Sequence, residues 1–183
     1  MLDLLKRGRR RDERYRIAAR YVQPGESVLD VCAGSGRLQK FLPENCPYAA
    51  MDGSPQFLSQ VRKKSRPTVL WDLHQGWPEK TPRADIIIMV ISFSQFRDVS
   101  AGTLLEDFKK GAKRVVIVEE VLERKRSQAS FIQKIINYLC GTDYYIPVSS
   151  WYTRQEFLQL MRDHGYQCEE VSNRYSIGSY GFK

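Results

Sequence analysis

The sequence lacks any apolar run long enough to cross a membrane. Among its 183 residues the longest wholly aliphatic or methionine run is IIIMVI at 86–91, whereas a membrane-spanning helix needs about 20 apolar residues. The basic N-terminus is not followed by the apolar stretch of a secretory signal. We therefore expect no transmembrane segment, and we expect the protein in the cytoplasm.

Metal-ligating residues are also scarce. The chain has two histidines and four cysteines, and no pair of cysteines has the spacing of a metal site. We expect no metal centre and reduced, buried thiols. Repeats, low-complexity tracts and linkers are absent as well, which favours a single domain over residues 24–183.

Acidic residues are few relative to basic ones, and the excess is concentrated. Of the formal net charge of +8, residues 1–20 carry +5, because they hold eight basic and three acidic side chains. Tyr15, Ala18, Ala19 and Val22 have helical spacing. Residues 1–23 are therefore predicted to form a basic helical arm, a candidate for contact with RNA or an anionic surface.

Apolar segments of strand length alternate with helix-period segments along the rest of the chain. Strands are predicted at 27–32, 48–51, 68–71, 86–91 and 114–118, with a final antiparallel pair at 167–172 and 175–182. Thr153 and Glu156 have capping-box spacing at the start of a helix that Gly165 ends. This alternation is typical of an α/β domain with a mainly parallel sheet.

The loop after the first strand carries the main functional signal. Gly34 and Gly36 permit a tight turn, and Ser35 is placed to cap a following helix whose free N–H groups would face a ligand. No P-loop string occurs, and Gln39 stands where a dinucleotide fingerprint needs its third glycine. Both phosphate-binding motifs are therefore excluded.

Acidic residues lie on the strand before this loop and after the next strand. These are Asp30 and Asp52. Asp52 is placed to accept hydrogen bonds from two ribose hydroxyls. The competing interpretation is a turn aspartate in Asp52-Gly53-Ser54-Pro55.

Together these segments resemble the class I S-adenosylmethionine-dependent methyltransferases. The resemblance is to the small-molecule branch that includes the ubiquinone and menaquinone biosynthesis enzymes, and it covers nearly the whole chain. VLDVCAGSGRL resembles the first family motif, AAMDGSPQFL the second and ADIIIMVISFSQF the fourth. The resemblance implies a Rossmann-like, doubly wound sheet of seven strands in the order 3-2-1-4-5-7-6, with strand 7 antiparallel.

The resemblance also implies S-adenosylmethionine as the cofactor, with S-adenosylhomocysteine as its product. Cys32 departs from the glycine of many members and narrows the space beside the amino-acid end of the cofactor. The implied cofactor-binding residues lie in the first motif, in the second motif and after the third and fourth strands: Asp30, Cys32, Ala33, Gly34, Ser35, Gly36, Asp52, Gly53, Asp72, Leu73 and Ile91.

No residue is assigned a catalytic role from the sequence. His74, two positions after Asp72, is a weak candidate for a general base, and a plain loop histidine is the competing interpretation. After the fourth strand, Ile91-Ser92-Phe93-Ser94 differs from the Asn/Asp-Pro-Pro-Tyr/Phe of base amino-group methyltransferases. The same segment lacks the carboxylate cluster of metal-assisted catechol methylation.

The best-supported function is methyl transfer to a small molecule, namely a phenolic, isoprenoid or amine metabolite or a lipid headgroup. Two alternatives stay open. One is an RNA methyltransferase that binds phosphates through the basic arm. The other is a non-catalytic subunit that binds S-adenosylmethionine.

Overall fold

The computed structural model describes residues 12–63, 66–97, 100–123 and 151–182. Its centre is a seven-stranded sheet in the order β3-β2-β1-β4-β5-β7-β6. The predicted strand order is confirmed. The strands are β1 (Val28–Val31), β2 (Tyr48–Asp52), β3 (Thr68–Leu70), β4 (Ala84–Val90), β5 (Ala112–Glu120), β6 (Gln167–Glu170) and β7 (Tyr175–Tyr180).

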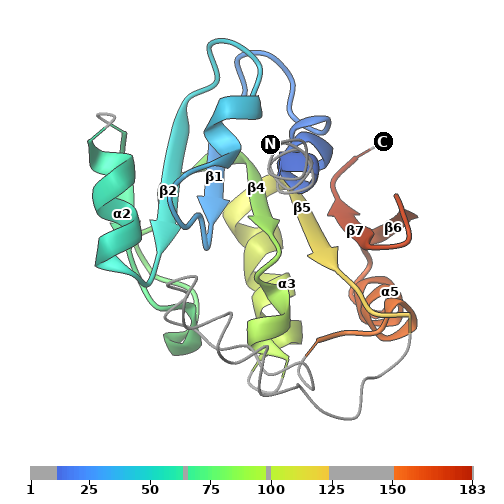
Figure 1. Ribbon diagram of the computed structural model, residues 1–183. Coiled ribbons are helices and arrows are strands. Elements are labelled where there is room, and N and C mark those ends of the chain that lie inside the picture. The colour runs from blue at the N-terminus through green and yellow to red at the C-terminus, as the bar shows by residue number, and fades with distance from the viewer. Residues whose placement is uncertain (1–11, 64–65, 98–99, 124–150, 183) are drawn as a thin grey trace, which may run out of the picture.

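The first five strands are parallel, and β7 pairs antiparallel with both β5 and β6. The carboxyl ends of β1, β2, β4 and β5 therefore lie at one edge of the sheet (Figure 1). Strand order reverses between β1 and β4, which are neighbours although two strands separate them in sequence. In open α/β sheets this reversal is where ligands bind.

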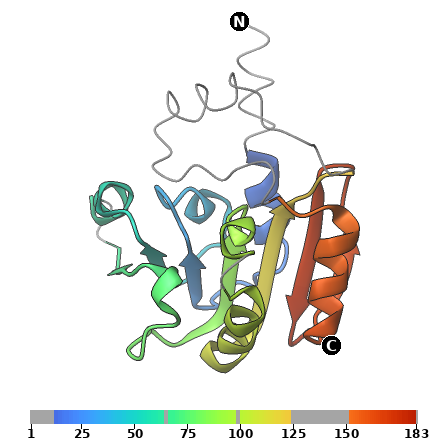
Figure 2. The same cartoon turned by 90° about the horizontal axis from the view of Figure 1, so that it is seen from below.

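Helices cover both faces of the sheet because the inner strands are apolar on both sides. Ile87 and Met89 of β4 belong to one core cluster with α3 (Ala101–Gly111) and α5 (Arg154–Asp163). Ile86 and Ile88 belong to the other cluster, with α2 (Pro55–Arg62) and a helix over residues 12–19. Figure 2 shows this division, with α3 and α5 on one side of the sheet.

Short-range signals in the sequence place α5 correctly. The Thr153 hydroxyl accepts a hydrogen bond from the Glu156 backbone N–H, and the Glu156 carboxylate accepts one from the Thr153 backbone N–H at 2.9 Å. Gly165, at φ 74°, ends the helix. The predicted capping box and the glycine stop are both confirmed.

Part of the predicted N-terminal arm packs into the domain. Ile17, Ala18 and Val22 are buried in the second core cluster. Val22 itself lies beyond the end of the 12–19 helix. Residues 1–11, which carry five of the arm's basic side chains, lie outside the described residues.

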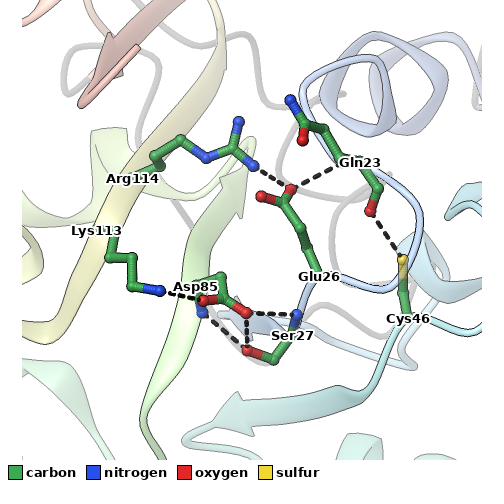
Figure 3. A network of polar contacts seen from close by, with 7 residues as sticks. All are labelled: Gln23, Glu26, Ser27, Cys46, Asp85, Lys113 and Arg114. Atoms are coloured by element: carbon green, nitrogen blue, oxygen red, sulfur yellow. Dashed lines mark hydrogen bonds and ion pairs between the residues drawn. The ribbon is translucent and has the colours of Figure 1, made fainter.

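The amino edge of the sheet is fixed by a polar network (Figure 3). The Asp85 carboxylate accepts hydrogen bonds from the Ser27 hydroxyl at 2.7 Å and the Ser27 backbone N–H at 3.1 Å, and it pairs with Lys113 at 2.9 Å. Glu26 pairs with Arg114 beside it. These contacts join the starts of β1, β4 and β5 on the edge opposite the glycine loop.

None of the described helices is long and apolar enough to cross a membrane. Within the described ranges, no group of three or more His, Cys, Asp or Glu side chains is arranged to hold a metal ion. Cys32, Cys46 and Cys168 are free thiols that are half-buried, less buried than expected, and Cys140 lies outside the described residues.

Candidate cofactor site

The chain turns sharply where β1 ends. Cys32 adopts φ 55°, in the left-handed region that a residue with a Cβ rarely enters. The Ala33 backbone N–H donates to the Met51 carbonyl at 3.0 Å, so the loop is tied to β2. Gly34 and Gly36, at φ 55° and 67°, complete the turn. The predicted tight glycine turn is present.

The two glycines of the turn have different surroundings. A Cβ on Gly36 would lie 2.9 Å from the Val61 Cγ2 atom and 3.2 Å from the Tyr48 hydroxyl, so Gly36 is needed for packing. A Cβ on Gly34 would meet nothing within 4 Å. The backbone at Gly34 therefore faces open space, where a ligand can approach closely.

The helix expected directly after this loop is absent. Instead, Leu38–Phe41 forms a single 3₁₀ turn, and its N-cap is Arg37, whose side chain makes no capping bond. The prediction that Ser35 caps a helix is wrong. Arg37 pairs with Asp12 at 2.5 Å, and this contact ties the segment to the 12–19 helix. The loop therefore lacks the helix N–H groups and helix dipole that were expected to face a ligand.

Asp52, at the carboxyl end of β2, joins the second motif to the glycine loop. Its Oδ2 atom accepts a hydrogen bond from the Gly34 backbone N–H at 2.8 Å, and its Oδ1 atom accepts one from the Ser54 backbone N–H at 2.8 Å. A carboxylate has about four acceptor sites, so each oxygen keeps capacity for another donor. Gly53, which follows it, is half-buried.

Asp30 has a different setting from Asp52. Its side chain is buried within the sheet and accepts a hydrogen bond from the Tyr48 hydroxyl at 2.6 Å. Burial raises the pKa of Asp30 to about 7, although the Tyr48 hydrogen bond opposes this shift. Tyr48 also packs near Gly36, so Asp30 supports the loop from beneath.

The third predicted acidic residue, Asp72, lies just beyond β3. Its Oδ1 atom accepts hydrogen bonds from the His74 backbone N–H at 3.0 Å, and it pairs with His74 Nδ1 at 2.9 Å. These contacts lower the pKa of Asp72, with the backbone bond as the largest cause. The His74 ring packs 4.8 Å from the Phe96 ring, while the Leu73 side chain is buried in the core.

Ile91 ends the fourth predicted strand in an unusual conformation. Its φ of 53° is strained for a β-branched residue, and its N–H donates to the Val118 carbonyl at 2.8 Å. Cys32 and Ile91 are therefore both left-handed, at the ends of the two strands that flank the order reversal. Such strained positions gather at functional sites.

Four acidic residues lie close enough to the Cys32 thiol to affect its pKa. Burial raises the pKa of the Cys32 thiol well above its usual value, and the negative charges of Asp52, Asp30, Asp72 and Glu119 raise it further. The predicted residues after β1, β2 and β3 are thus brought together at the carboxyl edge. Asp52 and Asp72 give this edge negative charge, which suits a ligand that carries positive charge.

Two residues that support this edge were not predicted from the sequence, and one of them, Tyr48, reaches it from the first position of β2. Tyr48 supports Asp30, and Glu119 at the end of β5 accepts hydrogen bonds from the Phe93 and Ser94 backbone N–H groups at 2.8 and 3.3 Å. The one available signal for Glu119 was a pair of glutamates that ends the buried run VVIVEE. A charged residue at that point of a buried strand needs a partner, but the sequence does not name it.

The chain matches the family described as "Methyltransferase domain" over residues 6–171. No curated protein matches it. Among solved structures, the PH0226 protein from Pyrococcus horikoshii OT3 is similar at a TM-score of 0.64 and 13% identity, with 96% of this chain and 91% of that chain covered. The plantazolicin methyltransferase BpumL in complex with SAH is similar at a TM-score of 0.64 and 14% identity, with 90% of this chain and 78% of that chain covered.

A third solved structure is longer. The pyocyanin biosynthetic protein PhzM is similar at a TM-score of 0.59 and 18% identity, and the match covers 92% of this chain but 55% of that one. The chain thus spans about half the length of PhzM. The family match confirms the predicted methyltransferase class, while the predicted quinone-pathway branch stays a prediction. The chain belongs to the methyltransferase-domain family and has the seven-stranded fold of the class I S-adenosylmethionine-dependent methyltransferases.

Proposed function

We propose that the protein transfers a methyl group from S-adenosylmethionine to a small-molecule acceptor, and that the carboxyl edge of β1, β2, β3 and β4 holds the cofactor. The observation that carries the proposal is the bond between the Asp52 carboxylate and the Gly34 N–H. It joins the acidic residue of the second motif to the loop of the first. The open space beside Gly34 lies next to this bond.

The charge of the site fits this cofactor. S-adenosylmethionine carries a sulfonium and an ammonium group against one carboxylate, so its net charge is positive. The carboxylates of Asp52 and Asp72 make this edge anionic, whereas Asp30 and Glu119, whose pKa is raised by burial to about 7, add less charge. The same carboxylates would repel the pyrophosphate of a dinucleotide, in agreement with the absence of both phosphate-binding motifs.

Each predicted binding residue has a proposed part. Asp52 accepts hydrogen bonds from the ribose hydroxyls, and the Gly34 backbone lies against the amino-acid end of the cofactor. Asp72 lies at the adenine end, and Ile91 borders the methyl group. The remaining members of the predicted set shape or support these positions: Asp30, Cys32, Ala33, Ser35, Gly36, Gly53 and Leu73.

For methyl transfer, the main task of the protein is to orient the acceptor relative to the cofactor. The cofactor supplies a methyl group that is already activated on a sulfonium with a neutral leaving group. Holding a nucleophile in line with that methyl group can contribute about 7–11 kcal/mol. A general base is required only for an acceptor that starts protonated. We assign no catalytic base, and His74, already bonded to Asp72, stays a weak candidate.

The small-molecule class of acceptor is supported by the segment after β4, which lacks the motif of base amino-group methyltransferases. Structural neighbours named for plantazolicin and pyocyanin biosynthesis share the fold. The RNA alternative rests on the basic residues of 1–11. A labelled-methyl transfer assay that compares a metabolite extract, total RNA and lipid vesicles separates these classes, and label confined to RNA would overturn the proposal.

The binding site is tested by substitution of Asp52. We expect Asp52→Ala to abolish measurable S-adenosylhomocysteine binding in calorimetry, because it removes both the ribose acceptor and the Gly34 contact. Loss of a charged hydrogen bond costs about 1.5–3 kcal/mol, and two or more are lost here. Asp163→Ala, on exposed α5 surface, is the matched control. Unchanged affinity in Asp52→Ala would defeat the proposed site.

A further inference from the structure

The segment directly after β4 forms a short turn that connects several parts of the carboxyl edge. Residues Phe93–Phe96 make a 3₁₀ turn in which Phe93, Ser94 and Phe96 are buried. The Phe93 ring packs 5.9 Å from Tyr152 and 6.3 Å from Phe157, between ring centroids. On the other side, the Phe96 ring packs against His74.

Glu119 holds this turn from the neighbouring strand. It is 2% exposed, and its Oε2 atom accepts hydrogen bonds from the Phe93 N–H at 2.8 Å and the Ser94 N–H at 3.3 Å. Its own backbone is paired with Ser176 of β7 in the sheet ladder. The carboxyl group is therefore directed at the turn and is not needed for strand pairing.

Burial of a carboxyl group at the end of β5 costs free energy. An apolar side chain at the end of β5 would pack without loss of hydration, whereas a carboxyl must be compensated by donors. Two of the donors to Glu119 are backbone N–H groups of the turn. The 3₁₀ turn has no side-chain cap of its own at Ser92. Glu119 supplies that cap from another strand.

We propose that Glu119 is a positioning residue: it fixes the turn after β4 and, through Phe96, it fixes the Asp72–His74 pair at the end of β3. Three contacts connect these groups. Glu119 accepts a hydrogen bond from the Phe93 N–H, at the start of the turn. At the end of the turn the Phe96 ring packs against His74, and His74 pairs with Asp72. That this pair borders the adenine end of a cofactor rests on the proposed function.

Amide hydrogen exchange tests the positioning role without cofactor or acceptor. In the wild type we expect the Phe93 and Ser94 amides to be protected. In Glu119→Ala they should exchange about tenfold faster or more, as expected when a buried N–H loses its acceptor. Glu119→Gln keeps one acceptor oxygen and should restore much of the protection. The Ala33 amide, bonded to Met51, is an internal reference that should not change.

The matched control is Glu120→Gln. Glu120 is the next residue of β5, carries the same functional group and pairs with Arg174. The Glu120→Gln substitution should leave hydrogen exchange at the Phe93 and Ser94 amides unchanged. Exchange rates that are equal in the wild type and Glu119→Ala, or equally raised in Glu120→Gln, would overturn the proposal.

Binding of S-adenosylhomocysteine tests the second half of the proposal. We expect a weaker affinity in Glu119→Ala, a rescue in Glu119→Gln and no change in Glu120→Gln. Altered exchange with unaltered affinity would overturn the link from the turn to the Asp72–His74 pair. If the wild type binds no S-adenosylhomocysteine at all, the proposed function fails, whereas the exchange result still decides whether Glu119 holds the turn.

If neither Glu119 variant folds, the wild type provides the test. The side-chain carboxyl carbon of Glu119 and the Phe93 and Ser94 amide protons should titrate with a common midpoint in nuclear magnetic resonance spectra. Two other titratable groups lie near this site. Asp30 also has a pKa of about 7, so the titration is repeated in Asp30→Asn, where the common midpoint should persist. Burial raises the pKa of the Cys32 thiol well above its usual value. Cys32 therefore does not titrate near neutrality. Midpoints that differ between the carboxyl and the amides would refute the contact.

Discussion

At the scale of single residues, the two glycines of the loop have separable roles. Gly34 faces open space, whereas Gly36 packs against Val61 and Tyr48. Both have positive φ, so an alanine at either position costs about 1 kcal/mol or more in backbone conformation. At Gly36 the added methyl group would also clash with the core side chains of Val61 and Tyr48.

We therefore expect Gly36→Ala to lower the free energy of unfolding more than Gly34→Ala does. Gly34→Ala should instead weaken S-adenosylhomocysteine binding, because its methyl group occupies the space beside the loop. Urea denaturation and calorimetry on both variants measure the two effects. Equal loss of stability with unchanged binding in both variants would contradict this division of roles.

Two buried carboxyl groups make stability depend on pH. Burial raises the pKa of Asp30 and of Glu119 to about 7, from ordinary values of 3.8 and 4.5. Between those limits the folded state binds more protons than the unfolded state, so stability decreases as pH rises. Asp85 acts oppositely: the Lys113 and Ser27 contacts lower its pKa, and its contribution is lost below about pH 4.

The urea midpoint is therefore expected to be highest near pH 5 and to fall through pH 8. The Asp30→Asn variant should show a smaller fall over that interval, because one of the two groups no longer titrates. Thr103→Ser, at an exposed position of α3, serves as a neutral control. A midpoint that rises steadily from pH 5 to pH 8 in the wild type would refute the two assignments.

At the scale of elements, α5 depends on its first turn. The Thr153 hydroxyl and the Glu156 carboxylate complete a capping box, and Glu156 also binds Arg97 at 2.7 Å. The start of α5 is thereby joined to the turn after β4. Substitution of Ser or Thr at an N-cap by Ala costs about 1 kcal/mol.

Thr153→Ala is expected to lower the free energy of unfolding by about 1 kcal/mol, and Thr153→Ser to restore it. Gln155→Ala, exposed in the same turn, should have little effect. Urea or thermal denaturation followed by circular dichroism measures the differences. A loss in Gln155→Ala as large as that in Thr153→Ala would show that the cap is not the cause.

The elements predicted correctly are those encoded by neighbouring residues. The buried β-branched runs, the capping box and the glycine stop are local patterns, and the predicted strands agree with the structure within about two residues at each end. At the 3₁₀ turn after the glycine loop, where the prediction was wrong, Arg37 pairs with Asp12, a residue 25 positions earlier. The Asp30–Tyr48 and Glu119–Phe93 bonds join residues 18 and 26 positions apart. Such contacts depend on strand order, which local patterns do not give.

At the scale of the whole molecule, the excess positive charge is unevenly distributed. Residues 1–11 contain five basic side chains and one acidic side chain, so their removal lowers the formal charge from +8 to +4. Asp12, which pairs with Arg37, remains in such a truncated protein. The domain and its candidate cofactor site should be unaffected.

We expect the truncated protein to lose salt-sensitive retention on heparin and on anionic vesicles, because phosphate and sulfate contacts are electrostatic and are screened by salt. Its S-adenosylhomocysteine affinity should equal that of the full chain. Elution at the same salt concentration before and after truncation would place the anion-binding surface elsewhere on the protein.

The polar network at the amino edge has a consequence for which parts of the protein tolerate substitution. Ser27, Asp85 and Lys113 fix the register of the three central strands from one side. Sequence change at the opposite edge, such as a cysteine in the first loop or an isoleucine in a strained turn, can then accumulate without disturbing strand alignment. Exchange of the loops at the carboxyl edge should therefore leave these contacts between the strands intact.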